Sequence, residues 1–199
     1  KHLKELIQQG MRAFVLDLRW NSGGLLSASG EVCELFLPKG SLVTYTRGRK
    51  SVNGTSDKDE MRLYTTREAV LPSDMPVVVL TNSETASAAE IVTGALQFYQ
   101  RAIVVGQRTF GKGSVQTIIP LERPKNSALR LTTALYYTPA DVTIDHQGIL
   151  PDKEVEMSRD EELALAKQMY SSFENNYENQ YKQNHGSMTP GYAATDETA

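Results

Sequence analysis

The sequence predicts an α/β domain in which a central sheet is flanked by helices. Short apolar runs rich in β-branched residues, typical of strands, alternate with longer segments in which apolar residues recur at helical spacing. Strands separated by helices are the pattern of such a domain. The length of 199 residues allows one domain with a substantial core, and the formal net charge of −3 gives no sign of a nucleic-acid-binding surface.

Helix and strand alternate at the start of the chain. Residues 1–10 predict a short helix that ends at Gly10, and residues 25–37 predict a second helix with one apolar face. Between them, the near-continuous apolar run 13–18 predicts a strand covered on both faces of its sheet, followed by a glycine turn at 21–24.

The rest of the chain predicts a β-hairpin, four further strands and two helices. The hairpin spans 41–66, and its polar tip at 53–58 is expected to be a mobile loop that either contacts substrate or is simply solvated. Strands are then predicted at 77–80, 101–106, 114–120 and 128–137, with helices at 87–99 and 158–182.

Three segments follow from this order. Residues 1–157 are predicted to form the core. Residues 158–183 form a C-terminal helix that opens on a capping-box pattern. Residues 184–199 are expected to be a disordered tail, because apolar anchors vanish there.

Two residues near the middle of the chain carry candidate chemistry. Ser87 lies where a strand turns into a helix, so unpaired backbone N–H groups and the positive end of the helix dipole converge on it. Lys112 lies between two glycines, where the backbone can approach a neighbour closely. We predict that Ser87 is a nucleophile and Lys112 its general base, because a serine hydroxyl needs a base to take its proton. The apolar flanks of Lys112 predict its burial, and burial favours a neutral lysine because desolvation penalises the ammonium form.

Structural interpretations of both residues exist. Ser87 is placed as an ordinary helix N-cap would be, and a lysine between glycines is usually a turn residue. Residues 106–112 also match the first part of a phosphate-binding P-loop. However, Gly113 stands where a Ser or Thr would hold magnesium, and the β-branched run 114–119 predicts a strand where a helix is required. The P-loop interpretation therefore fails.

Seven segments, in order, resemble the carboxyl-terminal processing peptidases, also called tail-specific proteases, a family of serine peptidases with a Ser-Lys dyad. The resemblance extends over residues 6–155. The matching segments are LDLRWNSGG (16–24), LFLPKG (35–40), YTRGR (45–49), TASA (85–88), TFGKGSVQ (109–116), YYTP (136–139) and GILPD (148–152).

The resemblance implies a role for each member of a catalytic group. Ser87 corresponds to the nucleophile, Lys112 to the general base, and Gln116 to the residue that positions the lysine amine. The oxyanion hole is implied to consist of the Ala88 N–H and one N–H of the glycine turn. Two such donors, aimed at the developing oxyanion, are often the largest electrostatic contribution to acyl transfer. Between Gly23 and Gly24 we prefer Gly24.

The family resemblance also implies properties of the whole protein. It implies a crotonase/ClpP-like core, no cofactor or metal, and cleavage of protein or peptide substrates near unstructured C-terminal tails. A PDZ domain and further core segments are expected to precede this chain in the intact protein, so activity is expected of the intact protein and is left open for this piece alone. The compartment is expected to be extracytoplasmic, periplasmic or membrane-associated, and a homo-oligomer is possible.

Two other classes of function stay open at this stage. One is a catalytically silent relative that acts as a peptide-binding scaffold, although it would be expected to have lost the dyad residues. The other is a crotonase-like acyl-CoA enzyme that shares only the fold, because a fold does not determine function.

The remaining reactive side chains indicate no second site. Cys33, the single cysteine, lies on the apolar face of a predicted helix and is expected to be a buried, non-catalytic thiol. The three histidines are scattered without metal-ligand spacing, so no zinc site is predicted. Asp17 and Arg19 are expected to be a structural charge pair near the end of a strand.

Overall fold

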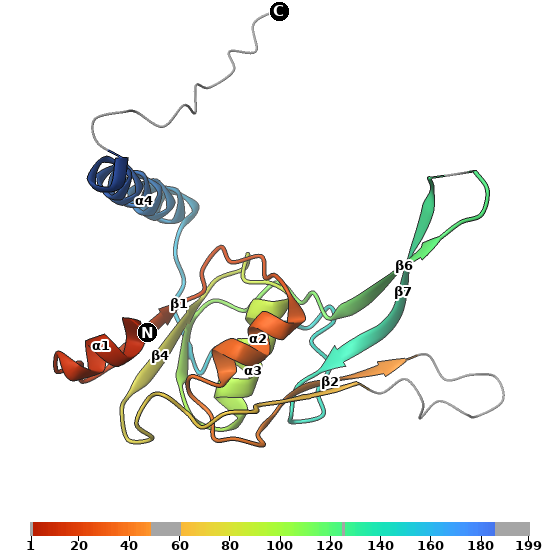
Figure 1. The fold of residues 1–199 in the computed structure, drawn as a ribbon, viewed down its shortest axis with the longest axis horizontal. Helices are drawn as coiled ribbons and strands as arrows, with labels where there is room; N and C mark the ends of the chain where they lie inside the picture. Colours follow the sequence, from red (N-terminus) through yellow and green to blue (C-terminus); the bar gives the residue numbers. More distant parts are fainter. Residues whose placement is uncertain (1, 49–60, 125, 186–199) are drawn as a thin grey trace, which may run out of the picture. The chain divides into compact units, whose positions relative to one another are not determined.

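The computed structural model describes residues 2–48, 61–124 and 126–185. The chain divides into two compact units, residues 1–155 and residues 156–199. Within the described residues, the first unit contains two four-stranded sheets and three helices (Figure 1). The described part of the second unit contains one helix, α4 (Arg159–His185). In the described part of the chain, no helix is both long and apolar enough to cross a membrane.

The first sheet is parallel and holds the strands that lead into the candidate site. Its spatial order is β1-β4-β5-β8, and its strands are β1 (Phe14–Asp17), β4 (Val77–Thr81), β5 (Ile103–Gly106) and β8 (Lys153–Glu154). Phe14 pairs with Val77, and Val79 pairs with Val104. Because all four strands run the same way, the loops that follow β1, β4 and β5 leave the sheet at one edge.

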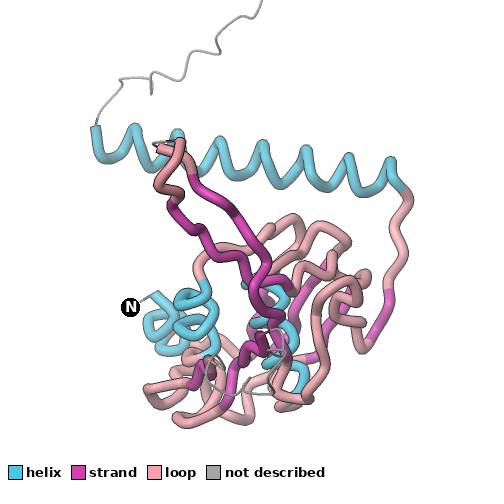
Figure 2. Tube along the Cα trace, turned by 90° about the vertical axis from the view of Figure 1, so that its right-hand side faces the viewer, coloured by secondary structure: helices cyan, strands magenta, loops and turns pink. Residues whose placement is uncertain are grey.

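The second sheet is antiparallel and has the order β3-β2-β7-β6. Its strands are β2 (Leu42–Gly48), β3 (Arg62–Tyr64), β6 (Ser114–Pro120) and β7 (Ala128–Tyr137). The outer parts of β6 and β7 form a two-stranded ribbon that projects from the rest of the first unit (Figures 1 and 2). A register shift between Val115 and Gln116 interrupts their pairing.

Helix α3 (Ala88–Phe98) is the centre of the core. Its residues from Ala88 to Leu96 are all buried, as expected of a helix that is apolar on most of its surface. Helix α2 (Leu26–Cys33) packs beside it, and α1 (His2–Gln8) contributes Leu3 and Ile7 at the margin. Fully or nearly fully buried apolar side chains come from both sheets and from the helices: Cys33, Phe36, Leu37, Val43, Val79, Ile91, Ala95, Leu96, Val104 and Ile144.

The α/β class is confirmed, but the single central sheet covered on both faces is not. The predicted hairpin strands belong to the separate antiparallel sheet. In the parallel sheet, Val15 and Ile103 lie on one face and are 59% and 58% exposed. Alternate residues of a strand point to opposite faces, so at Val15 and Ile103 this face is left open within the first unit. The apolar run 13–18 therefore predicted the strand correctly, but the predicted burial of both of its faces is wrong.

Some sequence predictions fall where the structure gives no description. The hairpin tip 53–58 and most of the predicted tail 184–199 lie outside the described residues. Helix α4 covers the segment in which the C-terminal helix was predicted.

Candidate active site

Three loops meet at the carboxyl edge of the parallel sheet. They follow β1, β4 and β5, and they carry the Gly23-Gly24 turn, Ser87 and Lys112 respectively. Backbone hydrogen bonds join the first two loops: the Ala86 N–H donates to the Asn21 carbonyl at 2.9 Å. The Phe110 N–H donates to the Thr85 carbonyl, also at 2.9 Å, and so joins the second loop to the third.

Ser87 occupies the N-cap position of α3 on a tight turn. Its φ of 57° and ψ of −121° lie in a region that side-chain-bearing residues seldom adopt. Such strain persists only where surrounding contacts enforce it, and it gathers at functional sites. The residue is half-buried, and it stands directly before the first, unpaired N–H groups of the helix.

The glycine turn after β1 is packed directly on the Ser87 turn. Gly23 has a φ of +97°, and a Cβ added there would lie 2.7 Å from the Ala86 carbonyl oxygen and 2.8 Å from the Ser87 Cβ. Only a residue without a side chain fits. The Gly23 N–H donates to the Asn21 Oδ1 at 2.9 Å, whereas the Gly24 N–H has no acceptor within the described residues.

The Ala88 N–H likewise has no acceptor in the described part of the chain, as the first N–H of α3. Ala88 is buried, so this donor is largely withdrawn from water. Two backbone donors, on Gly24 and Ala88, are therefore available on the two loops that the Gly23 contact holds together. Of the two glycines, Gly24 is thus the one whose N–H has no acceptor within the described residues.

The loop that carries Lys112 is held between α3 and the segment 145–148. The His146 N–H donates to the Gly111 carbonyl at 2.8 Å, and the Gly113 N–H donates to the Asp145 Oδ1 at 3.2 Å. A Cβ on Gly113 would lie 2.3 Å from the Asp145 backbone nitrogen. The glycines that flank Lys112 therefore allow a close backbone approach, as their pattern indicated.

The predicted burial of Lys112 is wrong for this structure, in which the residue is exposed. The flanking apolar residues do not enclose it. Phe110 is 63% exposed, and Ile118 and Ile119 lie on the projecting β6–β7 ribbon, where they are also exposed. Apolar neighbours in sequence bury a side chain only when the element itself faces the core, and this ribbon does not.

The buried carboxylate of Glu90 joins the Ser87 turn to the Lys112 loop. Its Oε2 accepts the Ser87 N–H and the Lys112 N–H, each at 2.8 Å. Its Oε1 accepts the Thr109 hydroxyl at 2.5 Å and the Gly111 N–H at 2.7 Å. Four donors compensate for the cost of burying a charge. Because one oxygen contacts both amides, the backbones of Ser87 and Lys112 are adjacent.

Sequence reasoning missed Glu90, although a signal was present. Ser87 and Glu90 have the S-x-x-E spacing of a capping box, in which the acid accepts the N-cap N–H. The three donors from residues 109–112 come from a distant loop and cannot be read from local spacing.

Gln116 follows Lys112 on β6, next to the register shift. Its side-chain oxygen accepts a hydrogen bond from the Arg130 Nε on the paired strand β7. Arg130 therefore contacts Gln116, the residue that the resemblance implies to position the lysine amine.

Asp17 and Arg19, at the end of β1, form an ion pair, and Cys33 is buried in the core. Arg19 donates to the Asp17 carboxylate at 2.6 and 2.9 Å, as predicted for a structural pair. Burial raises the pKa of Asp17, but hydrogen bonds and the charge of Arg19 outweigh this and leave the pKa below its ordinary value. Cys33 is fully buried, as predicted, and burial raises the pKa of its thiol to about 12.

This arrangement has the parts that acyl transfer needs. A serine lies on a strained turn at a helix N-terminus, the Ala88 and Gly24 N–H groups on this turn and the adjoining glycine turn have no acceptor within the described residues, and a lysine follows on an adjacent backbone. Such a set can provide a nucleophile, an oxyanion site and a base.

Known proteins are similar to this chain in sequence and fold. The profile of the family described as Peptidase family S41 matches residues 1–155. The "Carboxy-terminal-processing protease" of Bartonella bacilliformis is 51% identical over 146 residues, which are 73% of this chain and 31% of that protein. The "Carboxyl-terminal-processing peptidase 1, chloroplastic" of Arabidopsis thaliana is 39% identical over 151 residues, 75% of this chain and 29% of that protein.

A solved structure agrees with these relatives. The "Photosystem II D1 C-terminal processing protease" matches with a TM-score of 0.66 and 34% identity, over 77% of this chain and 37% of that one. The chain thus spans about a third of the length of the curated relatives that it matches.

Proposed function

Because the chain belongs to peptidase family S41, we propose that the intact protein is a serine endopeptidase that hydrolyses peptide bonds near the C-terminal tails of protein substrates. The observation that carries this proposal is the Glu90 oxygen shared by the Ser87 and Lys112 amides. It supports a dyad because it keeps the candidate nucleophile and base on adjacent backbones.

In the proposed mechanism, the Ser87 Oγ attacks the scissile carbonyl carbon while the Lys112 amine takes the hydroxyl proton. The resulting oxyanion is stabilised by the N–H groups of Ala88 and Gly24. The carbon–nitrogen bond then breaks, the lysine returns the proton to the leaving amine, and an acyl-enzyme remains on Ser87. The same lysine then takes a proton from water, whose oxygen attacks the ester carbonyl; the bond to the Ser87 Oγ breaks, and the lysine returns the proton to that oxygen, which releases the carboxylic acid. Gln116 is proposed to orient the lysine amine.

The exposure of Lys112 bears on when the dyad is competent. A lysine acts as a base only when its amine is neutral, and contact with water favours the charged form. We infer that a bound peptide covers the amine and removes this water, so that the base is completed by its substrate.

Several properties of the intact protein belong to the same proposal. They are a crotonase/ClpP-like core, a PDZ domain that binds substrate C-termini, an extracytoplasmic location and assembly into a homo-oligomer. The chloroplast relative agrees with a site of action outside the cytoplasm.

Two variants of the intact protein test the dyad. Ser87→Ala and Lys112→Ala should each abolish cleavage of an unfolded peptide that ends in an apolar tail. Ser83→Ala, at an exposed serine of the same loop, and Lys153→Ala, at an exposed lysine on β8, are the matched controls and should retain activity. Cleavage that persists in both dyad variants would refute the proposal.

The pH profile gives a second test. With chemistry rate-limiting, activity should rise with pH as the lysine base loses its proton. A profile that stays flat from mildly acidic to alkaline pH would contradict a lysine base.

A further inference from the structure

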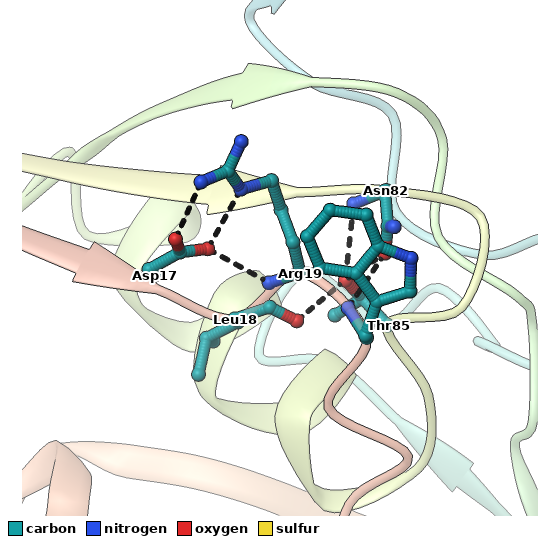
Figure 3. Close-up of polar contacts among 6 residues, drawn as sticks. Asp17, Leu18, Arg19, Asn82 and Thr85 are labelled. Carbon is teal, nitrogen blue, oxygen red and sulfur yellow. Dashed lines mark hydrogen bonds and ion pairs between the residues drawn. The ribbon is translucent and has the colours of Figure 1, made fainter. Parts of the chain in front are cut away.

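Two buried polar side chains of the β4–α3 loop hold the turn that follows β1. Asn82 is 5% exposed and Thr85 is fully buried, and both face the backbone of residues 18–20 (Figure 3). Neither side chain belongs to the proposed nucleophile, base or oxyanion donors.

Thr85 makes the first of these contacts. Its hydroxyl donates to the Leu18 carbonyl at 2.8 Å and accepts the Asn82 N–H at 3.1 Å. Leu18 is the residue directly after β1, so this bond sets where the turn begins. The hydroxyl is needed for both bonds, and no other part of the side chain can replace it.

Asn82 makes the second contact. Its Oδ1 accepts the Trp20 N–H at 2.9 Å and the Glu84 N–H at 3.3 Å. Trp20 has a φ of 57°, a conformation that is costly for a bulky residue and needs outside support. The Asn82 oxygen provides this support where the chain turns toward Gly23 and Gly24.

These contacts follow one another along the turn and lead to the contact between Gly23 and Ser87. Going along the turn, Leu18 is held by Thr85, Trp20 by Asn82, and the Asn21 carbonyl by the Ala86 N–H. Gly23 then lies against the Ser87 Cβ. Oxyanion donors act only within about 2.7–3.1 Å of the developing charge, so a small shift of the turn moves its donor out of reach.

We propose that Asn82 and Thr85 are positioning residues of the oxyanion hole, which hold the glycine turn in register with Ser87. The inference rests on the proposed peptidase function. It predicts that the two side chains affect the transition state, where the oxyanion exists, more than the binding of substrate.

Isosteric variants at Thr85 test this in the intact protein. Thr85→Val keeps the shape and removes the hydroxyl, and kcat should fall by roughly tenfold to a hundredfold, toward the loss seen when an oxyanion donor is deleted. KM should change by less than about twofold, because ground-state contacts persist. Thr85→Ser keeps the hydroxyl and is the matched control, with kcat close to that of the unaltered protein.

A second pair of variants, at Asn82, tests the same inference if Thr85→Val does not fold. Asn82→Ala removes the acceptor for Trp20, whereas Asn82→Asp retains an oxygen at the same place. The alanine variant should lose kcat and the aspartate variant should recover much of it. Thermal unfolding of each variant measures the folded fraction, so that kcat is compared per folded molecule.

Inhibition by a peptide aldehyde separates positioning from a merely structural role. The aldehyde forms a tetrahedral adduct with a serine and places an oxyanion in the hole, so its inhibition constant should rise in step with the loss of kcat. The inference is overturned if Thr85→Val and Asn82→Ala match their control variants in kcat, or if kcat and KM change while aldehyde affinity does not. If Ser87→Ala retains activity, the proposed function itself has failed instead.

Discussion

The carboxylate of Glu90 accepts the backbone N–H of Lys112 at 2.8 Å, although the two residues are 22 positions apart. The same oxygen accepts the Ser87 N–H. A buried acid thus places two loops that follow different strands of one sheet. Because Glu90 contacts the backbone N–H of Lys112, it fixes the position from which the lysine side chain extends.

Glu90→Gln should impair the site without removing bulk. The NH₂ group of the glutamine donates only, and it replaces one of the two carboxylate oxygens. The two donors that this oxygen accepts from, either Thr109 and Gly111 or Ser87 and Lys112, therefore lose their acceptor. We expect kcat/KM to fall by roughly tenfold to a hundredfold, as small misplacements near a reacting group do. The free energy of unfolding should decrease by about 1–3 kcal/mol. Glu31→Gln, on the exposed face of α2, is the control and should match the unaltered protein in both measurements.

The two glycines of the turn should respond differently to alanine. In Gly23→Ala, the Cβ would overlap the Ala86 carbonyl and the Ser87 Cβ at a φ of +97°, so either the turn or the nucleophile must move. Peptidase activity should fall by more than about a hundredfold, as when an oxyanion donor is lost.

Gly24→Ala is the matched comparison, because a Cβ there meets nothing within 4 Å. Its backbone N–H is retained, so stability should be unchanged and activity should largely persist. Equal losses in the two variants would contradict the packing of Gly23 on Ser87. Kinetic assays and thermal unfolding of both variants provide the measurement.

The meeting of three loops at one sheet edge could be predicted from the sequence, because buried-type strands precede each loop and helices separate them. Parallel strands then place their carboxyl ends together. The S-x-x-E spacing at Ser87 and the glycines around Lys112 are local signals of the same kind. They depend on contacts within a few residues, or on backbone that must lack a side chain.

The features that could not be predicted from the sequence depend on residues far apart in the chain. The donors that Glu90 gathers, the Asn82 contact with Trp20 and the exposure of Lys112 are set by loops far apart in sequence. Apolar periodicity also cannot decide which sheet a strand joins. The run 114–120 was predicted as a strand, but only its pairing with β7 in the projecting ribbon leaves Ile118 and Ile119 exposed.

The buried thiol of Cys33 should be chemically silent in the folded protein. Burial raises its pKa to about 12, and the thiolate is the form that reacts with alkylating agents. Native protein at mildly alkaline pH should not be labelled by iodoacetamide, whereas protein unfolded in guanidinium should take up one label. Cys33→Ser, which should remain unlabelled in denaturant, is the control. Rapid labelling of the native state would contradict the packing around α2 and α3.

The Asp17–Arg19 pair should make stability depend on pH in the acid range. Burial raises the pKa of Asp17, but the hydrogen bonds and charge of Arg19 lower it further, so the folded-state pKa is below the unfolded one. A carboxyl with a depressed pKa contributes stability above its unfolded value, about 3.9, and this is lost as the pH falls through the folded pKa.

A double-mutant cycle isolates this pair. Asp17→Asn, Arg19→Met and the double variant, unfolded in urea, should give a favourable coupling free energy at neutral pH. The coupling should decline below about pH 4 as Asp17 takes up its proton, and added salt should weaken it, since the two side chains are 30% and 20% exposed. A coupling that stays constant from neutral to strongly acidic pH would show that the hydrogen-bond geometry, rather than the charge of Asp17, stabilises the end of β1.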